Sequence, residues 1–280
     1  MSSSPLISVV IAVFNNVHTL EQALTSVTSQ TYQAKELLVI DGNSSDGSLE
    51  IIKNHSGDIS YWVSEPDQGI YQAWNKALKK IKGEWVIFLG ADDYFWDDRV
   101  LGKASERLKN LEESIGIFYG LVNVVNFDGK TLYTAGKGWE QSKKELVHRT
   151  SIPHPGTFHR HRLFKQYGSF DENLKIAGDY DFLLRVLRNE EAIFCDDFTI
   201  TAMRYGGISS SFKTARLRLR EDYMIKKKNG LSILNYYWFR KVFITYAREL
   251  LILLVGENKA RDIELKTRKS VKKESFWDHV

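Results

Sequence analysis

The stretch LISVVIAV, from Leu6 to Val13, runs through eight residues rich in β-branched side chains without alternating apolar and polar positions. Such a run is typical of a strand that is buried on both of its faces. Residues 17–29 follow it, and their apolar side chains fall on one helical stripe: Leu20, Ala23, Leu24 and Val27. A fully buried strand followed by a helix with one apolar face predicts the start of a parallel sheet that helices cover.

The same alternation continues through the first half of the chain. We expect strands at 36–41, 59–64 and 84–89, and helices at 46–54, 70–82 and 97–112. After this βαβαβαβ order the pattern changes, which predicts a mixed second half. We expect a hairpin of 115–127 and 131–135, helices at 160–167 and 179–189, and a strand at 192–204. The fold class is therefore α/β, with a mostly parallel central sheet flanked by helices.

The composition of the chain favours a folded protein without disulfides or a membrane-spanning helix. The chain has 280 residues, 43% of them hydrophobic, which is enough for a sizeable core and argues against disorder. The single cysteine, Cys195, excludes an internal disulfide and a cysteine zinc cluster, and we expect it to be buried. Because the sequence shows neither a signal peptide at Met1–Pro5 nor an apolar run of 18 residues, we expect a cytoplasmic protein without a spanning helix.

Charge is distributed unevenly. Residues 212–280 contain 17 Lys and Arg against 8 Asp and Glu, whereas residues 1–211 contain 22 against 27. We divide the chain into a catalytic domain at 1–205 and a tail at 206–280, with helices expected at 214–229 and 231–255. Arg240, Lys241 and Arg248 fall in one half of the second helix, which favours an amphipathic helix on an anionic membrane surface. Packing of this helix on the catalytic domain, or on a second copy in a homodimer, is the alternative.

Two common phosphate-binding motifs are missing from the chain. It contains neither G-x-G-x-x-G after the first strand nor G-x-x-x-x-G-K-[ST]. Polar turn residues instead follow four predicted strands, at 14–16, 41–43, 65–67 and 90–93. Because the carboxyl ends of parallel strands meet at one edge of a sheet, we expect a ligand site there.

Five segments carry a family resemblance. They are VVIAVFNN at 9–16, IDGNSSDGS at 40–48, SEPDQGIYQAWNKAL at 64–78, FLGADD at 88–93 and FDENLKIAGDYDFLLR at 170–185. Taken in this order, they resemble the family 2 glycosyltransferases with the GT-A fold, and the third resembles members that build bacterial surface polysaccharides. The resemblance implies inverting transfer from a nucleoside diphosphate sugar, taken here as UDP-linked, with Mn2+ or Mg2+. It also implies that Gly206-Gly207 opens a mobile loop over the diphosphate.

The resemblance also implies a donor site. Asp41 is expected to read the nucleotide base, and the other expected donor-binding residues are Ala12, Asn15, Asp67, Asn75, Asp92 and His154. Asp92 is the expected metal ligand and Asp93 the second candidate, although Gly90 stands where the family's D-x-D motif has its first acid. Purely structural roles stay open: a turn residue at Asp41, an acidic turn at Asp92, a helix position at Asn75 and a lone structural histidine at His154.

Two carboxylates compete for the general base. Three, four and seven residues after Asp179 the side chains are apolar, so this face of the helix should turn toward the protein or the cleft. Asp181 is followed four residues later by Arg185, which indicates a solvated ion-pair face. Asp179 is therefore the predicted base and Asp181 the runner-up, although Asp179 matches the family's E-D motif with Gly178 in place of Glu. Capping of the helix is the alternative for Asp179.

The expected partners follow from these assignments. They are a nucleoside diphosphate sugar, a saccharide or lipid-linked saccharide acceptor, and the inner face of a membrane. We expect no nucleic-acid partner, because the basic excess lies in the tail without a recognisable motif. A sugar-nucleotide nucleotidyltransferase and a catalytically weak nucleotide-sugar-binding module are the alternative functions. The first would need a glycine-rich phosphate loop after the first strand, where Phe14-Asn15-Asn16 stand instead.

Overall fold

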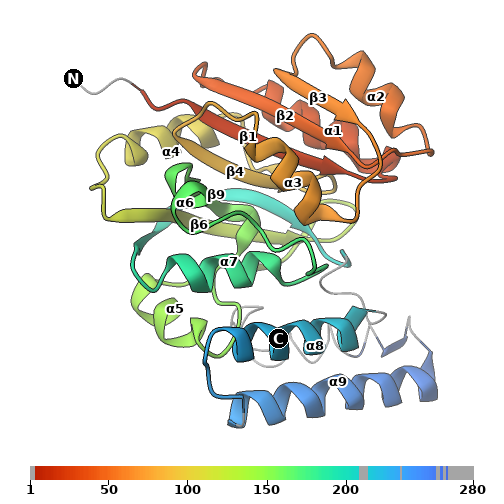
Figure 1. The fold of residues 1–280 in the computed structure, drawn as a ribbon. Coiled ribbons are helices and arrows are strands. Elements are labelled where there is room, and N and C mark those ends of the chain that lie inside the picture. Colours follow the sequence, from red (N-terminus) through yellow and green to blue (C-terminus); the bar gives the residue numbers. More distant parts are fainter. Residues whose placement is uncertain (1–3, 208–213, 234, 257–258, 261–262, 264–280) are drawn as a thin grey trace.

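The computed structural model describes residues 4–207, 214–233, 235–256, 259–260 and 263 (Figure 1). The strands of this part of the chain form one sheet in the order β3-β2-β1-β4-β8-β6-β9-β5, with β7 paired to β6. The first four of these positions hold the parallel strands β1 (Ile7–Val13), β2 (Lys35–Asp41), β3 (Tyr61–Ser64) and β4 (Trp85–Gly90). The parallel half predicted from the sequence is confirmed.

The helices of the first half are α1 (Val17–Thr28), α2 (Ser48–Asn54), α3 (Ile70–Leu78) and α4 (Val100–Leu108). Side chains of β1 alternate between two apolar cores. Val10 belongs to the core that α3 and α7 (Gly178–Val186) cover, and Ile11 to the core that α1 and α4 cover. This is why the sequence of β1 shows no polar face.

The second half is mixed, as the sequence predicts. Its other elements are β5 (Tyr94–Phe95), β6 (Ile115–Val125), β7 (Thr131–Ala135), α5 (Trp139–Leu146), η1 (His154–Gly156), β8 (Thr157–Arg160), α6 (Arg162–Gln166) and β9 (Glu191–Arg204). The hairpin of β6 and β7 is confirmed, and β8 runs antiparallel between β4 and β6. The helix expected at 160–167 begins later because residues 157–160 belong to a strand. The sequence did not reveal α5, in which only Ser142 and Leu146 are buried.

The two tail helices, α8 (Ala215–Lys228) and α9 (Tyr236–Val255), lie side by side at one end of the molecule (Figure 1). Both contact the rest of the chain. The Glu221 carboxylate of α8 accepts hydrogen bonds from the backbone N–H groups of residues 175–177, at 2.6–2.9 Å. On α9, the Tyr237 ring stacks on His148 with centroids 4.6 Å apart. The boundary near residue 206 stays a prediction, but α8 supports the loop that precedes α7.

No helix in the described part of the chain has both the length and the apolar composition needed to cross a membrane. Lys272 and Lys273, which belong to the basic excess of residues 212–280 expected to attract an anionic membrane, lie outside the described residues.

Candidate active site

A cleft of about 770 Å³ opens where the parallel strands β1 and β4 end. Of the predicted residues, the following line it: Ala12, Asn15, Asp67, Asp92, Asp93, His154 and Asp179. Gly206 and Gly207 also line it, while residues 208–213 of the expected mobile loop lie outside the described residues. Side chains from both halves of the chain thus meet in one space, at the sheet edge that the sequence predicts.

Asp92 and Asp93 lie in a turn directly after β4. Burial raises the pKa of Asp92, and burial together with the neighbouring Asp92 charge holds the pKa of Asp93 well above its usual range. The Asp93 carboxylate accepts a hydrogen bond from the Arg204 backbone N–H at 3.0 Å, and the Arg204 guanidinium donates to the Asp92 carbonyl oxygen. Apart from the Asp92 backbone N–H, no described residue donates a hydrogen bond to the Asp92 carboxylate, so Asp92 is the carboxylate that a bound cation can reach.

Neighbouring side chains on an extended chain point to opposite sides, which predicts from the sequence that Asp92 and Asp93 would not face one ion together. In the structure their carboxylates do not point to opposite sides. A Cβ atom added at Gly90 would lie 2.8 Å from Asp92 Oδ1 and 2.8 Å from Asp93 Oδ2, so both oxygens converge on Gly90. The expectation fails because residues 91–92 form a turn instead of an extended strand. The same crowding explains the departure from D-x-D, since the two acids already fill the space that a side chain at position 90 would take.

A metal fits this site only with few protein ligands. No group of three or more His, Cys, Asp and Glu side chains suited to a metal ion occurs in the described part of the chain. Mg2+ and Mn2+ accept sites with one or two carboxylates when phosphate oxygens and waters complete the shell. Asp92 fits such a site, because it is half-buried and accepts no hydrogen bond from another described residue, and its role as a ligand stays a prediction.

Asp179 stands at the start of α7, on the cleft wall. Its Oδ1 accepts hydrogen bonds from the Tyr180 backbone N–H at 2.8 Å and the Tyr71 hydroxyl at 3.4 Å. Burial outweighs these bonds and raises the pKa of Asp179 to about 6. A carboxylate with this pKa is ionised at neutral pH and is still basic enough to accept a proton.

Gly178, which replaces the Glu of the family's E-D motif, has a steric reason. A Cβ atom at this position would lie 2.8–2.9 Å from ring atoms of Tyr71. The Tyr71 ring is buried and its hydroxyl contacts Asp179. The departure at Gly178 therefore makes room for the tyrosine that contacts the candidate base.

Asp181 lies away from the cleft and is fully buried. Its predicted pair with Arg185 is present at 3.1 Å, and Lys228 of α8 approaches its carboxylate at 3.5 Å. The prediction that this face is solvated is wrong, because residues at the end of α8 cover it. Among the two candidates for the base, only Asp179 has access to the cleft.

Asp41 and Asn75 lie behind the cleft wall. The fully buried Asp41 carboxylate accepts hydrogen bonds from the hydroxyls of Ser44 at 2.5 Å and Ser64 at 2.6 Å. Asn75 is bonded in both directions to the backbone of Phe170. Both side chains hold loops that border the cleft, and direct contact of either with a nucleotide stays a prediction.

His154 is buried in an aromatic cluster beside the cleft. Its ring stacks on Trp74, with centroids 5.0 Å apart, and on Phe88, at 5.7 Å. Burial and the neighbouring His159 hold the pKa of His154 well below its usual value, so the imidazole is neutral at neutral pH. His154 can therefore donate or accept one hydrogen bond toward the cleft, but it does not add positive charge.

The cations of the cleft were not predicted from the sequence. Five line it: Arg149, Lys175, Arg204, Arg218 and Lys241. They come from two loops, two helices and the end of β9, and they share no motif or spacing, so only the basic excess of the tail indicated two of them. Cations beside buried carboxylates can stabilise the charge that develops on a leaving diphosphate.

Comparison with known proteins identifies the relatives of the chain. The sequence profile described as glycosyl transferase family 2 matches residues 8–170. An uncharacterized glycosyltransferase of Mycobacterium tuberculosis is 30% identical over 204 residues, covering 71% of this chain and 74% of that protein. A PGL/p-HBAD biosynthesis glycosyltransferase of Mycobacterium bovis is 26% identical, covering 75% of this chain and 81% of that protein.

Solved structures agree on the fold. The S. aureus TarS fragment 1-349, in complex with UDP-GlcNAc, is 20% identical with a TM-score of 0.59, covering 77% of this chain and 66% of that chain. This chain spans only 39% of a longer TarS structure. A Pyrobaculum calidifontis mannosyltransferase, in complex with GDP-Man and Mn2+, is 16% identical with a TM-score of 0.60, covering 96% and 81%. The expected GT-A fold with its C-terminal helix is confirmed.

Proposed function

Because the chain belongs to glycosyl transferase family 2, we propose that it is an inverting enzyme that moves a sugar from a nucleoside diphosphate sugar to an acceptor hydroxyl. The observation that carries the proposal is the cleft wall at Asp179, where a carboxylate with a pKa of about 6 shares one space with Asp92 and Arg204. The relatives in glycolipid biosynthesis support a saccharide or lipid-linked saccharide acceptor in the synthesis of a cell-surface polysaccharide or glycolipid.

Residues at one part of the cleft stabilise the leaving group, and Asp179 activates the acceptor. The diphosphate lies near Asp92 and the Arg204 guanidinium, whose charge favours the departure of the anionic leaving group. A divalent metal held by Asp92 would supply further charge stabilisation when bound. Asp179 accepts the proton of the acceptor hydroxyl, which attacks the anomeric carbon opposite the leaving group and inverts its configuration.

The donor is tested by a screen of nucleotide sugars. We propose a UDP-linked donor, supported by the UDP-GlcNAc complex of TarS, whereas the mannosyltransferase binds GDP-Man. A ligand present at about 100 times its Kd adds about 2.7 kcal/mol to the free energy of unfolding. UDP sugars should raise the melting temperature in the presence of Mn2+. A rise with GDP sugars alone would exclude a UDP donor, and hydrolysis of no nucleotide sugar would favour a binding module.

Asp92→Asn should abolish the Mn2+-dependent part of nucleotide binding, whereas Asp93→Asn should retain most of it. Both changes keep the size of the side chain and remove one charge. The difference is expected because Asp93 accepts a hydrogen bond from the Arg204 backbone, while no other described residue donates a hydrogen bond to the Asp92 carboxylate. Calorimetry of UDP with and without Mn2+ measures the effect. Equal losses in both variants would contradict the assignment of Asp92 as the principal ligand.

The outward face of α9 supports a membrane-bound enzyme. Its apolar side chains recur every three or four residues and are each more than half exposed: Tyr236, Phe239, Phe243, Tyr246, Leu250 and Leu253. We call them the apolar stripe. The predicted basic face of this helix turns the other way, because Arg240, Lys241 and Arg248 line a cavity against the rest of the chain. We propose that the apolar stripe enters an anionic bilayer, to which the net positive residues 212–280 are attracted.

The double change Phe239→Ser with Phe243→Ser should weaken binding to phosphatidylcholine–phosphatidylglycerol vesicles about 10- to 100-fold. Full burial of a phenylalanine contributes about 1.5–3 kcal/mol, and each of these rings gains only part of that amount, because it is already partly buried and enters the bilayer interface without crossing it. Phe127→Ser is the control, since this side chain is 75% exposed in the turn between β6 and β7 and does not belong to α9. Co-sedimentation measures both. If vesicle binding persists while the double change converts a dimer into a monomer, the apolar stripe contacts a second copy instead.

A further inference from the structure

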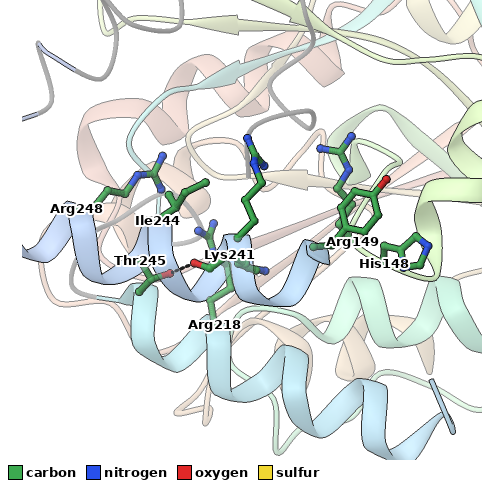
Figure 2. A pocket seen from close by; sticks show the side chains of 9 residues that line it. His148, Arg149, Arg218, Lys241, Ile244, Thr245 and Arg248 are labelled. Atoms are coloured by element: carbon green, nitrogen blue, oxygen red, sulfur yellow. Dashed lines mark hydrogen bonds between the residues drawn. The ribbon is translucent and has the colours of Figure 1, made fainter. Parts of the chain in front are cut away.

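A second cavity, lined by positive charge, lies between α9, α8 and the loop after α5 (Figure 2). Five cationic side chains line it: Arg149, Arg218, Arg240, Lys241 and Arg248. We call it the basic cavity. Figure 2 shows Arg218 on α8, Lys241 and Arg248 on α9, and Arg149 on the loop after α5. Its volume of about 20 Å³ leaves room for one small group and excludes a sugar ring.

The basic cavity adjoins the donor cleft. Arg149, Arg218 and Lys241 line both spaces, whereas Arg240 and Arg248 line the basic cavity alone. An anion in the basic cavity would therefore lie next to the sugar-transfer site and still be held by side chains that the donor cleft does not use.

The sequence of α9 places cations and apolar residues on different faces. Residues 237, 240, 241, 244, 245 and 248 follow helical spacing and all line the basic cavity. The apolar stripe lies on the outward face of the same helix. Contacts that hold α9 in this orientation include the His148–Tyr237 stack, and the ion pair between Lys241 and Asp222 of α8. The charges thus converge inward because the helix is anchored at these points.

Carboxylates offset only part of this charge. Glu145 pairs with Arg149 at 2.9 Å, and Asp222 pairs with Lys241. Arg240 makes no ion pair with any residue that the structure describes. Burial and the nearby Arg218 charge hold the pKa of Lys241 well below its usual range, so like charges are crowded here. Crowded, partly buried guanidinium groups are the arrangement that recognises phosphate in proteins.

We propose that the basic cavity binds one phosphate group of a lipid-linked acceptor whose lipid carries a phosphate or a diphosphate. This inference rests on the proposed function, because it assigns the substrate class of the same cleft. One helix would then serve both parts of such an acceptor, with the lipid beside the apolar stripe and the phosphate against Arg240 and Arg248. The sugar end of the acceptor would extend along Arg149, Arg218 and Lys241 into the cleft that contains Asp179.

The test uses the full chain and two double variants that each remove two positive charges. Arg240→Gln with Arg248→Gln changes the cations that line only the basic cavity. Arg220→Gln with Lys227→Gln is the control, since both residues are exposed on α8 and line neither space. The probes are neutral phosphatidylcholine vesicles carrying farnesyl diphosphate, vesicles with phosphatidylglycerol instead, and UDP with Mn2+ in solution.

The cavity variant should bind farnesyl diphosphate vesicles about 10- to 100-fold more weakly than the control, because charge-assisted hydrogen bonds are lost. Its affinity for UDP should be unchanged, and its loss on phosphatidylglycerol vesicles should not exceed that of the control. Equal binding by the two variants would overturn the proposal. An equal loss on both kinds of vesicle would reduce the cavity to a general headgroup contact, and a parallel loss of UDP affinity would assign it to the donor.

Failure of the proposed function has a different signature. If the wild-type chain hydrolyses no nucleotide sugar, but the cavity variant binds farnesyl diphosphate more weakly than the control, the phosphate site is supported and the transfer reaction is wrong. If the chain hydrolyses a nucleotide sugar but both double variants bind the diphosphate vesicles equally, the proposed transfer reaction is supported and the phosphate site is wrong.

Discussion

Asp179→Asn is expected to lower the rate of sugar transfer by about 10²–10⁴-fold, the usual contribution of a positioned general base. Asparagine keeps the shape of the side chain and an oxygen for the Tyr180 N–H and the Tyr71 hydroxyl. What it loses is the ability to accept a proton. Donor affinity should be retained, because the expected diphosphate contacts lie at Asp92 and Arg204.

The pH profile of the wild type supplies a second readout of the same prediction. Because burial raises the pKa of Asp179 to about 6, the carboxylate is ionised above this pH and protonated below it. Transfer should therefore fall as the pH drops through about 6. In Asp179→Asn the remaining activity should lack this step. A step that survives the substitution would assign the titration, and the base, to another group.

The pH dependence of the free energy of unfolding is a further test of the raised pKa of Asp179. The pKa of Asp179 is higher in the folded chain than in the unfolded chain, so the folded state binds more protons between the two values. The contribution of Asp179 to stability is consequently lost as the pH rises toward about 6. Asp179→Asn should be at least as stable as the wild type above that pH. If Asp179→Asn is less stable than the wild type above about pH 6, its loss of activity would reflect unfolding and would not identify Asp179 as the base.

The fold was largely predictable because its signals are local. Runs of apolar residues predict the four buried strands. Apolar stripes such as Leu20, Ala23, Leu24 and Val27 predict the helices between them. The helix α5 escaped because almost none of it is buried, so its sequence carries no stripe. The boundary of β8 was missed for a related reason. Four residues at 157–160 are too short for a periodic signal, and their strand form depends on the neighbours β4 and β6.

The site was predictable only where a motif marks it. Asp92 and Asp179 stand in recognisable segments, and both line the cleft. Arg204 has no motif, and its place beside Asp92 and Asp93 arises from the antiparallel pairing of β5 with β9. In the sequence, Gly90 and Gly178 are departures from the family's motifs without an explanation, whereas the structure relates each to neighbouring side chains that need the space.

The tail shows the same limit. Spacing alone separated the cations of α9 from its apolar residues, but it did not tell which face turns toward the rest of the chain. That orientation depends on the stacking of Tyr237 on His148 and on the ion pair between Lys241 and Asp222, whose partners are distant in sequence. The cations that were expected to meet lipid headgroups directly face inward, and the exposed face is the apolar stripe.

Asp181→Asn is expected to lower the free energy of unfolding by about 3 kcal/mol, because it breaks a buried, charge-assisted pair. The sequence predicted a small effect, on the assumption of a solvated pair with Arg185. The structure instead buries the Asp181 carboxylate completely, between Arg185 of its own helix and Lys228 of α8. Its loss weakens the contact of α7 with α8 and leaves two cations facing a neutral amide.

Asp171→Asn is the matched control, because Asp171 pairs with the same Lys228 at 3.1 Å but its side chain is 27% exposed and Lys228 is 51% exposed. An accessible pair of this kind contributes about 0–1 kcal/mol. Urea unfolding of both variants measures the difference, and turnover should stay near the wild-type value in each at a temperature where the chain is folded. An Asp181→Asn variant as stable as the wild type but inactive would place the base at Asp181, on the face of α7 that the structure turns away from the cleft.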